Sequence, residues 1–158
     1  MNITKALHHR PPYLLIQNVL SHTPESLCAV STFTGDEFFL QGHFPGTPVV
    51  PGAMMQEMST QAAGLLITLH HSPVLDYDSE TTKGWALGVL RAVHVARYKS
   101  FARPKEELKV TVNLIDRMEN SFRFNGTIHV GARKIMANEF TLVNISEEQL
   151  KGIHETHA

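Results

Sequence analysis

Residues 53–71 form the only long helical pattern in this chain of 158 residues, and the pattern is apolar on nearly every side. At roughly 1.5 Å per residue such a helix is about 28 Å long. A helix that is apolar all round cannot lie on a surface and must be enclosed by other structure. Polar residues within it, such as Gln56, Ser59 and Thr68, argue against a membrane span.

The residue pattern over most of the remaining chain predicts β-strands. Val110, Val112 and Leu114 alternate with polar residues, which is the period-two pattern of a half-buried antiparallel strand. Gly131-Ala132 fits a two-residue hairpin turn with glycine first. One long buried helix and about six strands predict an α+β fold in which a strongly curved antiparallel sheet encloses the helix. The predicted strands cover residues 13–20 (a strand or short element), 26–34, 85–90, 92–99, 108–115, 121–130 and 134–143.

Length and composition narrow the class of protein. The length predicts one domain over residues 1–158, with its core at about 7–145 and a polar, partly helical tail at 146–158. Lys and Arg number 14 against 15 Asp and Glu, so the net charge of −1 argues against a nucleic-acid-coating protein. A single cysteine, Cys28, excludes internal disulfides and multi-cysteine metal sites, and the N-terminus lacks an apolar signal. We therefore expect a cytoplasmic protein.

A glycine- and proline-dense loop, GHFPGTPVVPG, occupies residues 42–52 just before the helix. Three prolines and three glycines make it rigid, and it carries His43 and ends at Gly52, the predicted helix N-cap. Glu57 follows in the apolar helix, where an unpaired carboxylate costs several kcal/mol. An imidazole, a carboxyl group and free helix N–H groups together suit proton abstraction beside a carbonyl, with loss of a nearby hydroxyl.

Ordinary packing explains each of these features alone. Small and polar residues recur along one side of the predicted helix, which is also typical of a helix contact with Glu57 satisfied by local donors. A histidine in a tight loop is most often only hydrogen-bonded. The combination favours chemistry over packing. The residues of this polar stripe are Glu57, Thr60, Gln61, Gly64 and Thr68.

Four segments carry a resemblance to a known family. They are HRPPYLLIQNVL (9–20), GHFPGTPVVPG (42–52), QAAG (61–64) and ARYKSFARP (96–104). Over about residues 7–143 the chain resembles the β-hydroxyacyl-(acyl carrier protein) dehydratases of FabZ type, which adopt the hot-dog fold. The fourteen positions from His43 to Glu57 (57 − 43 = 14) equal the spacing of that family's catalytic histidine and glutamate.

The resemblance implies an activity and an assembly. His43 takes the C2 proton of a (3R)-hydroxyacyl thioester, and Glu57 of a partner chain protonates the departing 3-hydroxyl. The Gly52 N–H holds the thioester oxygen, and the Val49 carbonyl orients the imidazole. Phe44 and Gln61 join them as further substrate-binding residues. The resemblance also implies an acyl carrier protein as partner and a homodimer or trimer of dimers. It implies that no metal or organic cofactor is needed.

Exposed basic residues give the carrier protein a place to dock, although a solvated surface is the simpler interpretation. Two departures from the family pattern lie nearby, Ala92-Val93-His94 in place of a glycine-containing stretch and Pro104-Lys105-Glu106 in place of a Pro-Gly-Asp turn. A hot-dog thioester hydrolase and a non-catalytic acyl-thioester-binding subunit stay open as alternatives. The predicted docking residues are Arg97, Lys99, Arg103 and Lys105.

Overall fold

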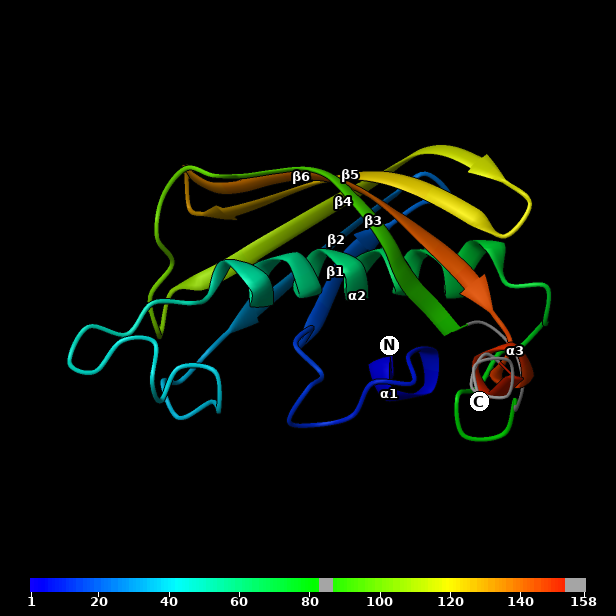
Figure 1. Cartoon of the computed structure of the whole chain (residues 1–158), viewed down its shortest axis with the longest axis horizontal. Coiled ribbons are helices and arrows are strands. Elements are labelled where there is room, and N and C mark those ends of the chain that lie inside the picture. The colour runs from blue at the N-terminus through cyan, green and yellow to red at the C-terminus, as the bar shows by residue number, and fades with distance from the viewer. Residues whose placement is uncertain (83–86, 153–158) are drawn as a thin grey trace.

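A single curved sheet arches over one long helix (Figure 1). The computed structural model describes residues 1–82 and 87–152. All strand pairs are antiparallel, and the strands follow the order β1-β2-β4-β5-β6-β3 across the sheet. This confirms the predicted α+β architecture with the sheet around a central helix. The elements are α1 (Ile3–Ala6), β1 (Asn18–His22), β2 (Ser26–Thr32), α2 (Gly52–His71), β3 (Leu87–Tyr98), β4 (Glu107–Met118), β5 (Ser121–Val130), β6 (Arg133–Ile145) and α3 (Glu147–Gly152).

The core lies between α2 and the concave face of the sheet. Met58, Leu65 and Leu66 of the helix are fully buried, and they belong to one hydrophobic cluster with Phe124 and Phe140 of β5 and β6. Burial of each such side chain contributes about 1.5–3 kcal/mol relative to exposure. The apolar character of the helix therefore reflects enclosure within a protein core. Among the described helices none is both long and apolar enough to cross a membrane.

Several predicted boundaries were wrong. Residues 13–17 precede β1. The Leu15 N–H donates to the Gln61 side chain, and the Gln17 N–H is shared between Ser31 Oγ (3.2 Å) and the Val30 carbonyl (3.4 Å). The helix N-cap is Pro51, whose carbonyl accepts from the N–H groups of Met54 and Met55, and Gly52 is the first helical residue. The cap was misplaced because it involves no side-chain hydrogen bond.

The two strands predicted over residues 85–99 form one strand, β3, whose pairing with β6 shifts register twice. Irregular pairing breaks the alternation of side chains, which explains why the pattern indicated two strands. Residues 85 and 86 lie outside the described part of the chain. β5 has the predicted bounds, and the Gly131-Ala132 turn is confirmed, with Gly131 at φ +55°.

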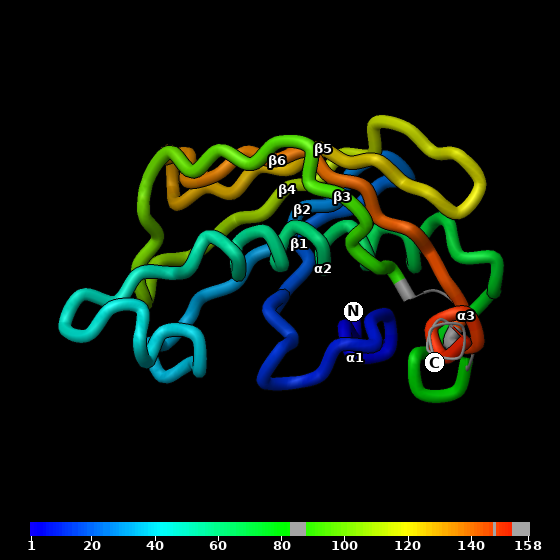
Figure 2. Tube along the Cα trace, viewed as in Figure 1, coloured from blue at the N-terminus to red at the C-terminus, as the bar shows by residue number. Residues whose placement is uncertain are grey.

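The side of α2 that faces away from the sheet is covered by the N-terminal segment. Figure 2 shows the chain descending from β1 to α1 beneath the middle of the helix. Arg10 fixes this segment, because its guanidinium donates to the Leu7 carbonyl (2.7 Å) and to Ser79 Oγ (3.0 Å). The Ser79 N–H in turn donates to the Lys5 carbonyl (2.7 Å). The short helix α3 follows β6, and residues 153–158 of the predicted tail lie outside the described chain.

Candidate active site

His43 is held by the backbone of its own loop. Its Nδ1 lies 3.0 Å from the Val49 carbonyl oxygen, and the Val49 N–H donates back to the His43 carbonyl at 3.0 Å. A carbonyl only accepts, so Nδ1 carries a hydrogen, and in the neutral ring the lone pair lies on Nε2. The Phe44 ring, which is 56 % exposed, stacks on the imidazole with centroids 4.2 Å apart. The loop thus presents an imidazole with a basic Nε2.

Gly52 lies beside His43, at the first turn of α2. Both residues line one cavity of about 350 Å³, together with Phe44 and Val49. The Tyr98 hydroxyl donates to the Gly52 carbonyl (3.2 Å), and a Cβ on Gly52 would come within 2.9 Å of the Tyr98 ring. Any larger residue at this position would therefore have to displace the Tyr98 ring. Within the described chain no hydrogen bond uses the Gly52 N–H, which is one of the unpaired donors of a helix start.

Glu57 lies one and a half turns further along α2 in a different environment. Its side chain is only 14 % exposed, and its Oε1 accepts from Gln61 Nε2 at 3.0 Å. Burial raises the pKa of Glu57 above its ordinary value, while hydrogen bonds from Gln61 and the Tyr13 hydroxyl act in the opposite direction. The net effect favours the protonated carboxyl group, which is the form that a general acid needs.

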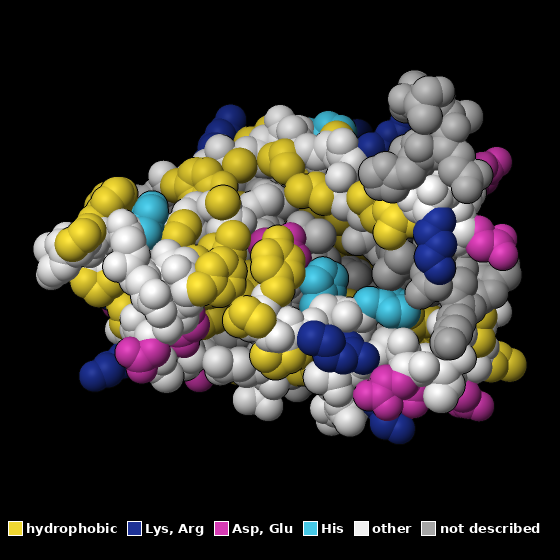
Figure 3. All heavy atoms as spheres, turned by 60° about the horizontal axis from the view of Figure 1, so that its bottom comes forward, with side chains coloured by type: hydrophobic (Ala, Val, Ile, Leu, Met, Phe, Trp, Pro, Cys, Tyr) yellow, Lys and Arg dark blue, Asp and Glu magenta, His cyan; other side chains and the backbone are white. Residues whose placement is uncertain are grey.

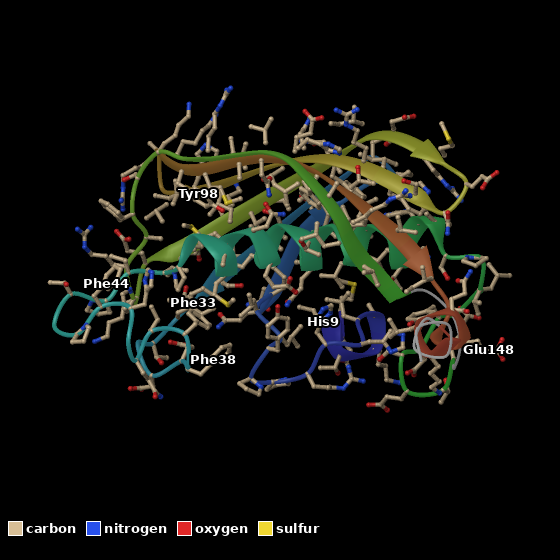
Figure 4. The ribbon with its side chains drawn as sticks, in the orientation of Figure 1. His9, Phe33, Phe38, Phe44, Tyr98 and Glu148 are labelled. Carbon is tan, nitrogen blue, oxygen red and sulfur yellow. The ribbon has the colours of Figure 1, made fainter. Side chains whose placement is uncertain are left out.

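Within one chain, His43 and Glu57 belong to different surroundings. The cavity that His43 lines is bounded by residues 43–55 and 98–101 and does not include Glu57. Figure 4 shows His9 beneath the middle of α2, whereas Phe44 and Tyr98 lie toward the end at which the helix begins. His9 is the neighbour of Glu57, with Nε2 3.5 Å from Oε1.

The polar stripe predicted on α2 faces a second cavity, of about 260 Å³, beneath the helix. Thr60, Gly64 and Thr68 line it together with His9. Gln61 is fully buried beside the stripe and contacts the N-terminal segment, accepting from the Leu15 N–H at 2.8 Å and donating to the Tyr13 carbonyl at 2.8 Å. Gln61 therefore lies with Glu57, and Phe44, Val49 and Gly52 lie with His43.

The four predicted docking residues are all exposed, and none forms a side-chain hydrogen bond or ion pair within the described chain. Lys99 lines the His43 cavity. Lys105 has φ +68°, so it adopts the left-handed conformation that suits the glycine usual at the corresponding turn of the resembled family. This departure keeps the turn and exchanges glycine for an exposed charge.

Sequence reasoning missed two residues beside Glu57. His9 lies against the carboxyl group, and Tyr13 is hydrogen-bonded to it and stacks on the His9 ring with centroids 6.0 Å apart. Both lie in the segment HRPPYLL, which was recognised as part of a pattern but given no role. A second missed pair is Asn138 of β6, which donates to Gln56 Oε1 at 2.9 Å in the core.

Other polar groups give less chemistry. In the part of the chain that the structure describes, no cluster of three or more His, Cys, Asp or Glu side chains is placed to hold a metal ion.

Figure 3 shows the underside of the molecule, where histidine side chains lie next to a group of hydrophobic ones. Tyr13, Phe38 and Phe44 are among the large hydrophobic side chains exposed at 43–56 %.

Comparison with protein families gives a match to the FabA-like domain over residues 7–139. A 3-hydroxyacyl-[acyl-carrier-protein] dehydratase FabZ from Shewanella pealeana is 36 % identical over 140 residues, covering 87 % of this chain and 86 % of the relative. The enzyme of the same name from Legionella pneumophila strain Lens is 32 % identical over 126 residues, covering 79 % of each chain.

Solved structures with the same fold include a chain of the dehydratase heterocomplex ApeI:P from Xenorhabdus doucetiae. It matches with a TM-score of 0.79 and 20 % identity over 97 % of both chains. A mutant form of the fluoroacetyl-CoA-specific thioesterase FlK matches with a TM-score of 0.66 and 12 % identity, covering 87 % of this chain and 98 % of that one. At these identities the likeness establishes the hot-dog fold alone.

Proposed function

The chain belongs to the FabA-like family and is a 3-hydroxyacyl-[acyl-carrier-protein] dehydratase, a hydro-lyase, and we propose that His43 and Glu57 carry out its two proton transfers. The observation that carries this assignment is the bond between His43 Nδ1 and the Val49 carbonyl, which leaves Nε2 as a base in a cavity shared with Gly52. Glu57, whose pKa is raised by burial, is the proposed acid.

The reaction needs both groups in one elimination. His43 Nε2 removes the C2 proton of a (3R)-hydroxyacyl thioester, and the electron pair of that C–H bond forms the C2–C3 double bond. The C3–O bond breaks, and the leaving hydroxyl takes the Glu57 proton to depart as water. The thioester oxygen gains negative charge during proton removal, and the Gly52 N–H stabilises it there. The proton on His43 then returns to Glu57.

We place each complete site between two subunits. This explains why the His43 cavity of one chain does not contain Glu57. The edge strand β3 offers the surface for a second copy, because it is twelve residues long and has exposed apolar side chains along it, including Val89, Val93 and Val95 at 39–44 %. An unpaired strand edge of this kind is suited to extending the sheet into a neighbour. A homodimer, or a trimer of such dimers, is the assembly proposed.

The substrate is proposed to arrive on an acyl carrier protein, as the names of the relatives indicate for those enzymes. The exposed cations Arg97, Lys99, Arg103 and Lys105 are the proposed docking residues, since a carrier of acidic surface would be attracted to them. A cytoplasmic location is part of the same proposal.

A crotonyl thioester tests the function directly. A dehydratase hydrates it reversibly to the 3-hydroxybutyryl thioester, which is followed by loss of the enoyl-thioester absorbance and by mass. Release of free thiol would instead indicate a thioester hydrolase, and binding without either product would indicate a non-catalytic subunit. Either of these results would overturn the proposal.

The placement of the site between subunits is tested by mixing two inactive variants. His43→Ala and Glu57→Gln subunits, co-folded, should regain one intact site in each mixed dimer. Native mass spectrometry verifies that mixed dimers have formed. Mixed dimers without recovered activity would mean that both groups act within a single chain.

A further inference from the structure

The side chain of His9 lies against Glu57, although nothing in the elimination described above uses it. His9 Nε2 is 3.5 Å from Glu57 Oε1, and the two side chains are only 29 % and 14 % exposed. The N-terminal segment that carries His9 is fixed by Arg10, which donates to the His9 carbonyl (3.0 Å) and to Ser79 Oγ (3.0 Å). The imidazole is therefore held at the carboxyl group by the fold.

Gln61 presents its amide nitrogen to one oxygen of Glu57. Its own Oε1 accepts from the Leu15 N–H (2.8 Å), and a backbone amide N–H can only donate, so the Gln61 nitrogen is the group that faces Glu57. That nitrogen donates to Glu57 Oε1 at 3.0 Å. His9 Nε2 approaches the same oxygen. Gln61 therefore donates to Oε1, His9 Nε2 lies against the same oxygen, and the Tyr13 hydroxyl also bonds the carboxyl group.

The state of the His9 ring follows from its surroundings. Its Nδ1 is buried with no hydrogen-bond partner in the described chain, so a hydrogen there would be a buried donor without an acceptor. Burial lowers the pKa of His9, and the neighbouring His8 and Arg10 lower it further. The other titratable groups at hand are Tyr13 and Glu57 themselves, with His8 bonded to the Tyr77 hydroxyl. A neutral ring with its hydrogen on Nε2 satisfies these conditions.

We propose that His9 is a positioning residue for Glu57: its Nε2–H, together with the Gln61 amide, holds Oε1 as a hydrogen-bond acceptor and keeps the transferable proton on Oε2. This inference rests on the proposed function. When the proton leaves, the carboxylate that forms is met by donors already in place, and the 3.5 Å contact shortens as its charge develops. A neutral His9 also avoids an ion pair that would deprotonate the acid beforehand.

The test compares three substitutions of His9 in the full-length protein, with crotonyl-N-acetylcysteamine as substrate. His9→Leu removes the donor and should lower kcat by about 10- to 100-fold, the usual effect of one hydrogen bond to a charged group. The alkaline limb of the pH–rate profile should move to higher pH, since a carboxyl group that loses a donor has a higher pKa. His9→Gln, whose amide reaches the position of Nε2, should restore most of the rate, whereas His9→Asn should not.

His129→Leu on β5 is the matched control, and it should behave as wild type. If His9→Leu keeps the wild-type rate and pH profile, or if His9→Gln is no better than His9→Asn, the positioning role is wrong. The Gln–Asn comparison decides the question even where the leucine variant does not fold. An infrared titration measures the pKa of the Glu57 carboxyl group without turnover. The band of this group is identified by its loss in Glu57→Gln. Inactive wild-type protein would overturn the proposed function, whereas an unshifted infrared titration in the His9 variants would overturn this inference.

Discussion

The loop that carries His43 and the helical turn that carries Glu57 restrain their side chains in different ways. His43 is half-exposed beside an open cavity and is oriented by one backbone carbonyl, that of Val49. Glu57 is largely buried and is contacted by side chains from its own helix and from the N-terminal segment. The difference matches the two proposed tasks. A base needs a free lone pair within reach of substrate, whereas an acid must hold its proton until it is required.

The largest expected effect is the loss of turnover when either group is removed. His43→Ala and Glu57→Gln should each lower kcat by about 10²- to 10⁴-fold, the usual contribution of a positioned proton-transfer group. Steady-state kinetics on a crotonyl thioester measures the loss, and circular dichroism verifies the fold. Either variant keeping near-wild-type turnover while folded would exclude that residue from the chemistry.

Chemical rescue sharpens this comparison. Added imidazole should restore part of the activity of His43→Ala, because the vacated position opens onto a cavity of about 350 Å³. Added acetate should not restore a Glu57→Ala variant, because the carboxyl position is enclosed by Gln61 and the N-terminal segment. Rescue of both variants, or of neither, would contradict the contrast between an open base and an enclosed acid.

A smaller loss is expected from a methyl group at the start of α2. Gly52→Ala places a Cβ within 2.9 Å of the Tyr98 ring, which must shift and so lose its hydrogen bond to the Gly52 carbonyl. We expect kcat/KM to fall by about 10-fold, since small displacements of positioning groups have effects of this order or larger. Because Tyr98 is 49 % exposed and can move, the melting temperature should change little. The double variant Gly52→Ala/Tyr98→Ala removes the clash and serves as the control. A Gly52→Ala variant as active as wild type would show that the contact with Tyr98 is irrelevant.

Glu57, the proposed acid, should also make the stability of the protein depend on pH. The folded-state pKa of Glu57 is raised by burial above 4.5, so its contribution to stability is present at acidic pH and is lost as pH rises through the folded value. The free energy of unfolding of wild type relative to Glu57→Gln should therefore decrease with increasing pH. Urea unfolding at a series of pH values measures this difference.

Glu37 provides a control of opposite sign. Burial acts to raise its pKa, but the backbone N–H groups of Thr34 and Gly35 donate to the carboxylate and hold the pKa below its ordinary value. Its contribution is present above the unfolded pKa and is lost as pH falls. The free energy of unfolding of wild type relative to that of Glu37→Gln should thus increase with rising pH. Parallel trends in the two comparisons would contradict the assignment of Glu57 as a protonated acid.

The smallest effect is expected at the proposed docking surface. Arg97 and Arg103 do not line the His43 cavity. Replacing both by Ala should raise KM for an acyl-carrier substrate by about two- to five-fold at low salt. The effect should fade as salt rises, because exposed charges are screened over a Debye length of about 8 Å at physiological ionic strength. Turnover of a short soluble thioester should stay unchanged, and Lys109→Ala on β4 is the control. Equal losses on both substrates would remove these residues from carrier binding.

Local pattern predicted much of this arrangement. Periodicity alone gave the bounds of β5 and most of α2, and the glycine- and proline-rich loop led directly to His43 and Gly52. The surroundings of Glu57 were not predictable in this way, because His9 and Tyr13 come from a segment far upstream that meets the helix only in the folded chain. The interruptions of β3 at Leu90/Ala92 and Val93/Val95 arise from pairing with β6. The sequence pattern indicated a break near the first of them, but it did not show that one strand continues through it.

The exposed edge of β3 has a consequence for biosynthesis. If the proposed dimer forms, a newly folded subunit that has not met its partner carries a twelve-residue strand with one free edge and apolar side chains at Val89, Val93 and Val95. Such an edge recruits any strand that reaches it, so the monomer is the species most exposed to aggregation. The yield of native protein on refolding should therefore pass through a maximum with concentration, because dilution delays the correct encounter and crowding favours incorrect ones. Synthesis of neighbouring chains on one messenger would bring the two partners together while these edges are still free.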